Sequence, residues 1–107
     1  LDGFLDKVLD DFSICDRTFN YVIKSSDIDL SHHLNNVAYV RILFDAFTSS
    51  ELSLLNLTEI ETAYKSQCYE GEMLTIKLKN TQTGIIAAMV KEDKICFTAR
   101  LICNPIL

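Results

Sequence analysis

A run of apolar residues with helical spacing, residues 36–54, constrains the fold more than any other part of this chain. One face of the run carries Val37, Val40, Leu43, Phe44 and Phe47. Tyr39, Ile42 and Ala46 widen that face, so a helix over these residues would be apolar around most of its circumference. The sequence therefore predicts one long helix, from about residue 36 to about residue 54, which needs apolar cover on most sides.

The other segments alternate apolar and polar residues in the manner of β-strands. Residues 17–25 form one such segment before the helix, and residues 57–69 form another after it. Three more follow at residues 72–80, 85–90 and 94–103. The last two are the most apolar, so we expect them at the centre of a sheet or against a partner. The order predicts one strand, a helix and then four strands in an antiparallel meander.

A strongly curved sheet wrapped around the helix would supply the apolar cover that the helix needs. This arrangement is the hotdog fold, an α+β fold in which a curved antiparallel sheet surrounds a long central helix. The length of 107 residues fits one domain. We assign residues 17–107 to a single hotdog domain. Residues 1–16 are expected to form a helical connector, because their apolar positions have helical spacing.

Composition and charge exclude several classes of protein. The net charge of −5 disfavours wholesale binding to nucleic acid or to an anionic membrane, because the summed field repels phosphate. The apolar runs are interrupted by charged residues, which argues against a membrane span. Four cysteines without a Cys-x-x-Cys pair indicate reduced thiols, so we expect a cytoplasmic protein. No cofactor is implied.

A dense polar cluster precedes the apolar helix. Residues 27–36 hold two aspartates, two histidines and two asparagines. Asn35 or Asn36 suits the helix N-cap. Asp29 taken alone would form a turn with its own backbone, and His33 taken alone would be a partly buried packing residue. A metal site is disfavoured, because the spacing is tight and matching ligands are absent elsewhere in the sequence.

Residues 27–40, with the sequence DIDLSHHLNNVAYV, resemble the motif of the acyl-acyl-carrier-protein (acyl-ACP) thioesterases within the hotdog superfamily. That motif reads Asp-x-Asp-x-Asn-x-His-Val-Asn-Asn-x-x-Tyr at the start of the central helix. A second landmark, residues 59–76, resembles the strand that reads Tyr-x-x-Glu-Cys in the family. The resemblance implies a thioesterase that hydrolyses fatty acyl-ACP or acyl-CoA in fatty acid biosynthesis.

The resemblance also implies the residues of the site. The catalytic aspartate and histidine of the family align with Asp29 and His33. Two positions depart from the family pattern, because Ser31 stands for an asparagine and Gln67 for a glutamate. We expect Asp29, His33, Ser31 and Gln67 to be the catalytic set. The expected substrate-binding residues are Asn35, Asn36, Val37, Tyr39 and Cys68.

The residue chemistry fits thioester hydrolysis. The reaction needs a held water, a base for its proton and donors for the developing oxyanion. Asp29 or His33 could serve as the base, and the free amides at the start of the helix could bind the carbonyl oxygen. The acyl chain would lie in the apolar space between helix and sheet. Because an amide cannot remove a proton, Gln67 cannot replace a glutamate base, although its carbonyl oxygen could hold a water.

Several alternatives stay open at this point. Cys68 could be a nucleophile with His33 and Asn35, or a packed thiol. The substitutions at Ser31 and Gln67 motivate a second hypothesis beside the hydrolase, a non-catalytic module that binds acyl thioesters. Acyl-ACP and acyl-CoA share a phosphopantetheine arm and are not separated by the sequence. Because a single hotdog leaves a strand edge open, we expect a homodimer or pairing with a second hotdog domain of a tandem protein, of which this chain would be the C-terminal half.

Overall fold

A computed structural model of the protein describes residues 15–103. Residues 1–14 of the expected helical connector lie outside the described residues. Cys15 and Asp16 of the expected connector are described, and Asp16 is hydrogen-bonded to the sheet. Its backbone amide donates to the carbonyl oxygen of Leu78 at 2.8 Å, and its carboxylate accepts from the amide of Asn80 at 2.6 Å.

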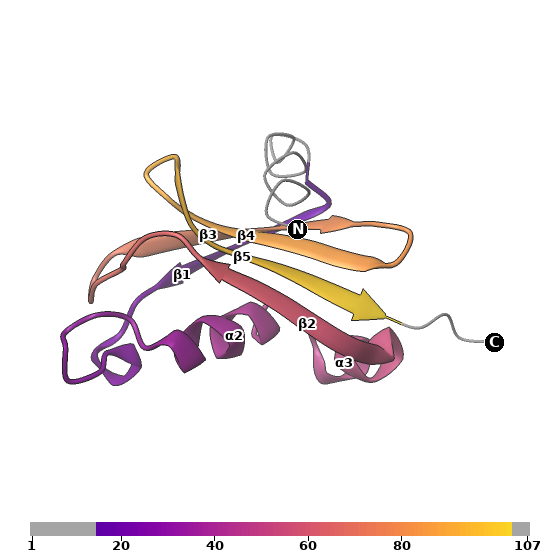
Figure 1. Cartoon of the computed structure of the whole chain (residues 1–107), viewed down its shortest axis with the longest axis horizontal. Coiled ribbons are helices and arrows are strands. Elements are labelled where there is room, and N and C mark those ends of the chain that lie inside the picture. The colour runs from indigo at the N-terminus through magenta and orange to yellow at the C-terminus, as the bar shows by residue number, and fades with distance from the viewer. Residues whose placement is uncertain (1–14, 104–107) are drawn as a thin grey trace.

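Five strands and two α-helices make up the described chain (Figure 1). The bounds of the strands are β1 Arg17–Val22, β2 Leu57–Tyr64, β3 Met73–Asn80, β4 Gly84–Lys91 and β5 Lys94–Cys103. A short 3₁₀ helix, η1 (Ser25–Asp27), follows β1. The α-helices are α2 (Asn36–Phe44) and α3 (Ser49–Leu55), and both lie on the same face of the sheet.

The sheet is antiparallel, with the strand order β1-β3-β4-β5-β2. The predicted four-strand meander is wrong in one connection, because only β3, β4 and β5 form a meander. β2 pairs with β5, with Tyr64 opposite Phe97, and so lies at the far edge of the sheet. The prediction that the two most apolar segments are central is confirmed. β4 is the middle strand, and β5 is its neighbour.

The predicted long helix is two helices in the structure. α2 ends at Phe44, and α3 begins after Thr48. The break has a local cause. The Thr48 hydroxyl accepts from the Glu51 amide at 3.1 Å, and the Glu51 carboxylate accepts from the Thr48 amide at 2.8 Å. This capping box begins a new helix inside a run whose apolar spacing would have allowed the first one to continue.

Side chains fill the space between α2 and the sheet. Ile42 and Leu43 of α2 are completely buried, as are Leu74 and Ile76 of β3 and Phe97 of β5. An acyl chain in this space, as predicted from the sequence, would have to displace core side chains. A site for chemistry is therefore expected outside this filled interior, at the amino end of α2, where polar residues lie.

Candidate active site

A buried carboxylate anchors the loop that carries the predicted site. Asp27 is 2% exposed and accepts hydrogen bonds from the Tyr21 hydroxyl at 2.7 Å and from the Lys24 amide at 2.9 Å. It also pairs with the guanidinium of Arg41 on α2. The Asn35 amide donates to the Asp27 carbonyl oxygen at 3.0 Å. Asp27 therefore connects β1, the loop and α2.

The loop closes on itself between Asp27 and Asn35. An isolated bridge pairs Ile28 with Leu34, and the Asp29 amide donates to the His33 carbonyl oxygen at 3.0 Å. His32 takes a positive φ of 68° at the tip. The turn places the side chains of Asp29, Ser31 and His33 together.

Ser31 bridges the other two side chains. The Asp29 carboxylate accepts from the Ser31 amide at 2.9 Å and from the Ser31 hydroxyl at 2.5 Å. The same hydroxyl lies 3.2 Å from Nδ1 of His33. Asp29 thus forms the local turn expected of a lone aspartate. It is also the first of three side chains, Asp29, Ser31 and His33, that are linked by hydrogen bonds. The hydrogen bonds from Ser31 hold the pKa of Asp29 below its usual range.

Asp29 and His33 face a hollow of about 480 Å³ at the amino end of α2. Six of the residues predicted from the sequence line it: Asp29, His33, Asn35, Asn36, Tyr39 and Gln67. The structure thus brings the helix start and the loop after β2 to one place, as the two landmarks require.

Three other predicted residues lie outside the lining. Ser31 reaches the site only through Asp29 and His33. Val37 is 77% exposed and lines a separate hollow of about 180 Å³ beside Arg41. Cys68 is completely buried, with its sulfur 3.9 Å from the Ser66 carbonyl oxygen. This placement is that of a packed thiol.

The predicted N-cap is confirmed as Asn35. Its side-chain oxygen accepts from the Val37 amide at 2.9 Å, and its carbonyl oxygen accepts from the Ala38 amide at 2.9 Å. Two first-turn amides that could have bound a substrate carbonyl are therefore already engaged.

The sequence predicted neither Tyr64, at the end of β2, nor three other residues of the lining. Leu34, Tyr64, Lys65 and Ser66 also line the hollow. Tyr64 donates to the Asn36 carbonyl oxygen at 3.2 Å, and its ring meets the ring of Tyr39 edge to face at 5.4 Å. Tyr39 in turn stacks on Phe97 at 4.9 Å. The pairing of β2 with β5, in which Tyr64 lies opposite Phe97, places Tyr64 here. The residues around Tyr64 in the sequence do not predict this pairing.

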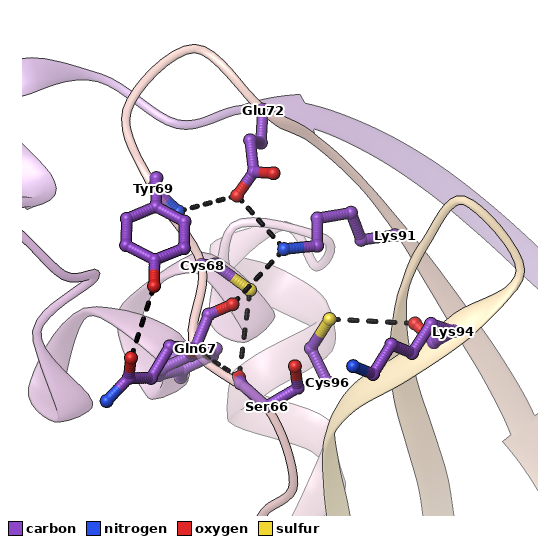
Figure 2. Close-up of polar contacts among 9 residues, drawn as sticks. Ser66, Gln67, Cys68, Tyr69, Glu72, Lys91, Lys94 and Cys96 are labelled. Atoms are coloured by element: carbon purple, nitrogen blue, oxygen red, sulfur yellow. Dashed lines mark hydrogen bonds and ion pairs between the residues drawn. The ribbon is translucent and has the colours of Figure 1, made fainter.

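The loop after β2 is held by a second polar network (Figure 2). Lys91 donates to the Gln67 carbonyl oxygen at 3.2 Å and to the Glu72 carboxylate at 3.1 Å. Glu72 also accepts from the Tyr69 amide at 2.7 Å. The Tyr69 hydroxyl donates to the side-chain oxygen of Gln67 at 3.2 Å. Between residues 15 and 103, no group of three or more His, Cys, Asp or Glu side chains could hold a metal ion.

The sequence model of a family described as acyl-ACP thioesterase C-terminal domain matches residues 15–103. The chain belongs to the acyl-ACP thioesterase family. A search of curated proteins gave no match. The predicted family is thus confirmed, while the roles of individual residues stay predictions.

Solved structures confirm the hotdog fold. A 12:0-ACP thioesterase from Umbellularia californica aligns with a TM-score of 0.78 at 18% identity, over 88% of this chain and 37% of its own. An acyl-ACP thioesterase from Bacteroides thetaiotaomicron gives 0.71 at 21% identity, over 83% and 37%. A Staphylococcus aureus protein solved in complex with CoA gives 0.67 at 20% identity, over 79% and 71%.

The chain therefore spans 37% of the length of the two acyl-ACP thioesterases that it matches. Among the helices formed by residues 15–103, none is long and apolar enough to cross a membrane.

Proposed function

We propose that this domain hydrolyses fatty acyl thioesters carried by acyl carrier protein, with a water activated by Asp29 and His33. The observation that carries the proposal is the hydrogen-bonded chain of Asp29, Ser31 and His33 at the hollow beside the amino end of α2. Membership of the acyl-ACP thioesterase family supports the reaction class and the carrier.

The hydrogen bonds indicate which nitrogen of His33 would act. The Ser31 hydroxyl has one proton, and its 2.5 Å contact with the Asp29 carboxylate indicates that it donates there. Towards Nδ1 of His33, at 3.2 Å, the same hydroxyl then accepts. Nδ1 therefore carries the ring proton, and Nε2 keeps a lone pair for a proton from water. The ionised Asp29, through Ser31, stabilises the imidazolium that forms.

The step is an ordinary acyl transfer to water. The water oxygen bonds to the thioester carbonyl carbon while one of its protons passes to Nε2 of His33. The resulting oxyanion collapses, the C–S bond breaks, and the proton returns from His33 to the leaving thiolate. The products are a carboxylic acid and a free thiol, and the scheme uses no cofactor.

We further propose that a second hotdog domain completes the site, either in a homodimer or in a tandem protein. The hollow is lined mainly by polar residues, and the helix–sheet interior is filled, so an acyl chain needs another apolar surface. Val37 on α2 is 77% exposed, and Tyr64, which lines the hollow from the edge strand β2, is 47% exposed. A partner seated there would supply that surface.

A cytoplasmic location is also proposed. All four cysteines are free thiols, which fits a reducing compartment.

The test measures thiol release from a panel of acyl-ACP and acyl-CoA substrates of several chain lengths. Asp29→Asn should lower kcat/KM by about 10²-fold or more, the usual effect of removing a general base or its charge. Asp45→Asn, which makes the same change in an exposed residue at the end of α2, should match the wild type. An Asp29→Asn enzyme as active as the wild type contradicts the mechanism, and turnover of acyl-CoA alone contradicts the carrier.

A second candidate is a binding module that does not hydrolyse its ligand. The observation that favours it is Gln67, which lines the hollow where the family motif has a glutamate. Tight binding of acyl-ACP without thiol release, by wild type and Asp29→Asn alike, would support this function.

A further inference from the structure

The side-chain amide of Gln67 is hydrogen-bonded to its neighbour Tyr69. The Tyr69 hydroxyl donates to Oε1 of Gln67 at 3.2 Å. In Figure 2 the amide nitrogen of Gln67 points away from Tyr69. Because the carbonyl oxygen is already engaged and Gln67 lines the hollow, the amide can offer the hollow its N–H donors. This differs from the expectation that the carbonyl oxygen would hold a water.

The loop that carries Gln67 is held in place by Lys91. Lys91, at the end of β4, donates both to the Gln67 backbone carbonyl oxygen and to Glu72, and its ammonium lies 5.6 Å from the centre of the Tyr69 ring. The Lys91 side chain is only 16% exposed, so water competes little for these contacts. Lys91 thereby fixes the backbone of Gln67 and the position of Tyr69 together.

Tyr69 also touches the proposed base. Its ring meets the ring of His33 edge to face, with centroids 5.5 Å apart. One tyrosine therefore contacts His33 through its ring and Gln67 through its hydroxyl. A proton acceptor and an amide donor are held on two sides of the same side chain, at the same hollow.

The proposed hydrolysis needs a hydrogen-bond donor to the thioester carbonyl oxygen. A tetrahedral intermediate places negative charge on the former carbonyl oxygen, and preorganised N–H groups stabilise it. At the helix start, the amides of Val37 and Ala38 already donate to Asn35. Gln67 is uncharged, lines the same hollow and carries two side-chain N–H groups.

We infer that Gln67 is a hydrogen-bond donor to the thioester carbonyl oxygen, and that Tyr69 is the positioning residue that orients it. The inference rests on the proposed thioester hydrolysis. It assigns to Gln67 a role opposite in chemistry to that of a glutamate base, since the residue gives a hydrogen bond and takes no proton.

Gln67→Glu separates the two roles. A carboxylate has no N–H at neutral pH and repels an oxyanion, so kcat should fall by about 10²-fold or more, as when one oxyanion donor is lost. Gln82→Glu makes the same change in the exposed turn between β3 and β4 and should leave kcat unchanged. If Gln67→Glu equals or exceeds the wild type, the donor role is wrong and the glutamine replaces a base.

Tyr69→Phe tests the positioning role. The ring and its contact with His33 remain, while the hydrogen bond to Gln67 is lost. We expect kcat to fall by about threefold to tenfold, the range of one neutral hydrogen bond, with KM unchanged. A purely structural role would lower the melting temperature and leave kcat of the folded enzyme as it was, and that result would overturn this part of the inference.

A binding measurement keeps the inference separate from the proposed function. A ketone analogue of acyl-CoA, in which a methylene replaces sulfur, keeps the carbonyl and is not hydrolysed. In a ¹⁵N-labelled wild-type protein saturated with this analogue, the side-chain N–H signal of Gln67 should move downfield, and Gln67→Glu identifies that signal by its loss. Absence of thiol release together with this shift contradicts only the hydrolase, whereas an unmoved signal at saturation overturns the donor role even in an active enzyme.

Discussion

Two aspartates of the same motif have different surroundings and therefore different tasks. Asp27 is buried and bonded on several sides, whereas Asp29 is exposed and faces the hollow. The sequence placed both in one polar cluster and could assign Asp29 to the site only through the family resemblance. The task of Asp27 depends on Tyr21 and Arg41, which come from β1 and α2 and meet only in the folded chain.

Asp27 should make stability depend on pH. Burial raises its pKa, but the Lys24 amide, the Tyr21 hydroxyl and Arg41 lower it more, so the folded pKa lies below the ordinary value. Because the folded pKa is the lower one, the stabilisation is complete above about pH 4 and is lost as pH falls through the folded pKa. Asp27→Asn should reduce the free energy of unfolding by about 2 kcal/mol at pH 7.

Urea unfolding between pH 7 and pH 3 measures this effect. The difference between wild type and Asp27→Asn should shrink as pH drops below about 4, since the Asp27 carboxylate takes up a proton in the unfolded chain before it does so in the folded one. Asp45→Asn is the control, because Asp45 is exposed. A difference of constant size across the range would show that ionisation of Asp27 contributes nothing.

Gln67 marks the limit of residue-level prediction. Its presence at the site followed from the resemblance, but the direction of its amide depends on Tyr69 and Lys91. Whether the Tyr69 hydroxyl meets the oxygen or the nitrogen of the Gln67 amide depends on the folded positions of both side chains. No spacing rule in the sequence contains that information.

At the scale of elements, most strands were predictable and their neighbours were not. Alternation identified each strand, yet β2 was expected to run to Tyr69 and ends at Tyr64, because residues 65–72 form the loop that carries Gln67. A loop of that length permits either a hairpin or a crossing to the far edge. The structure takes the second route, and β5 pairs with β2 as well as with β4.

The turn between β3 and β4 requires a glycine at Gly84, the first residue of β4, because there is no space for a side chain there. A Cβ built on Gly84 would lie 1.8 Å from the carbonyl oxygen of Leu101, and that oxygen belongs to the backbone of β5. The neighbour cannot move without disturbing the central pair of strands. Gly84→Ala should therefore lower the free energy of unfolding by about 3 kcal/mol, at the upper end of the range for overpacking.

Gly71→Ala is the matched comparison for this glycine. Gly71 also has a positive φ, of 86°, but a Cβ there would meet nothing within 4 Å. It should cost only the conformational strain, about 1 kcal/mol. If urea unfolding gives the same decrease in the free energy of unfolding for both variants, the close contact between the new Cβ and Leu101 does not destabilise the fold.

At the scale of the whole molecule, the fold leaves one apolar flank uncovered. The sheet covers the side of α2 that bears Tyr39, Ile42 and Leu43, and these are buried. The prediction that the helix needs cover on most sides is met on this side only, because Val37 is 77% exposed. The edge strand β2 contacts the start of α2 through the hydrogen bond from Tyr64 to the Asn36 carbonyl oxygen, and Tyr64 is 47% exposed.

This flank should make the isolated chain a dimer in solution. Pairing through β2 and the exposed side of α2 would bury Val37 and Tyr64 and would place a second copy beside the hollow. Light scattering after size exclusion should give twice the 12.1 kDa of one chain. Val37→Glu should shift the protein to the monomer, because a charge in the buried centre of an interface opposes association.

Val22→Glu provides the comparison, because Val22 is also an exposed valine but ends β1 at the opposite edge of the sheet. It should leave the dimer intact. If both variants dissociate equally, or if the wild type is a monomer at tens of micromolar, the flank does not join two copies. If instead only Val37→Glu is monomeric and it also loses thioester hydrolysis while remaining folded, the proposal that the second copy completes the site is supported.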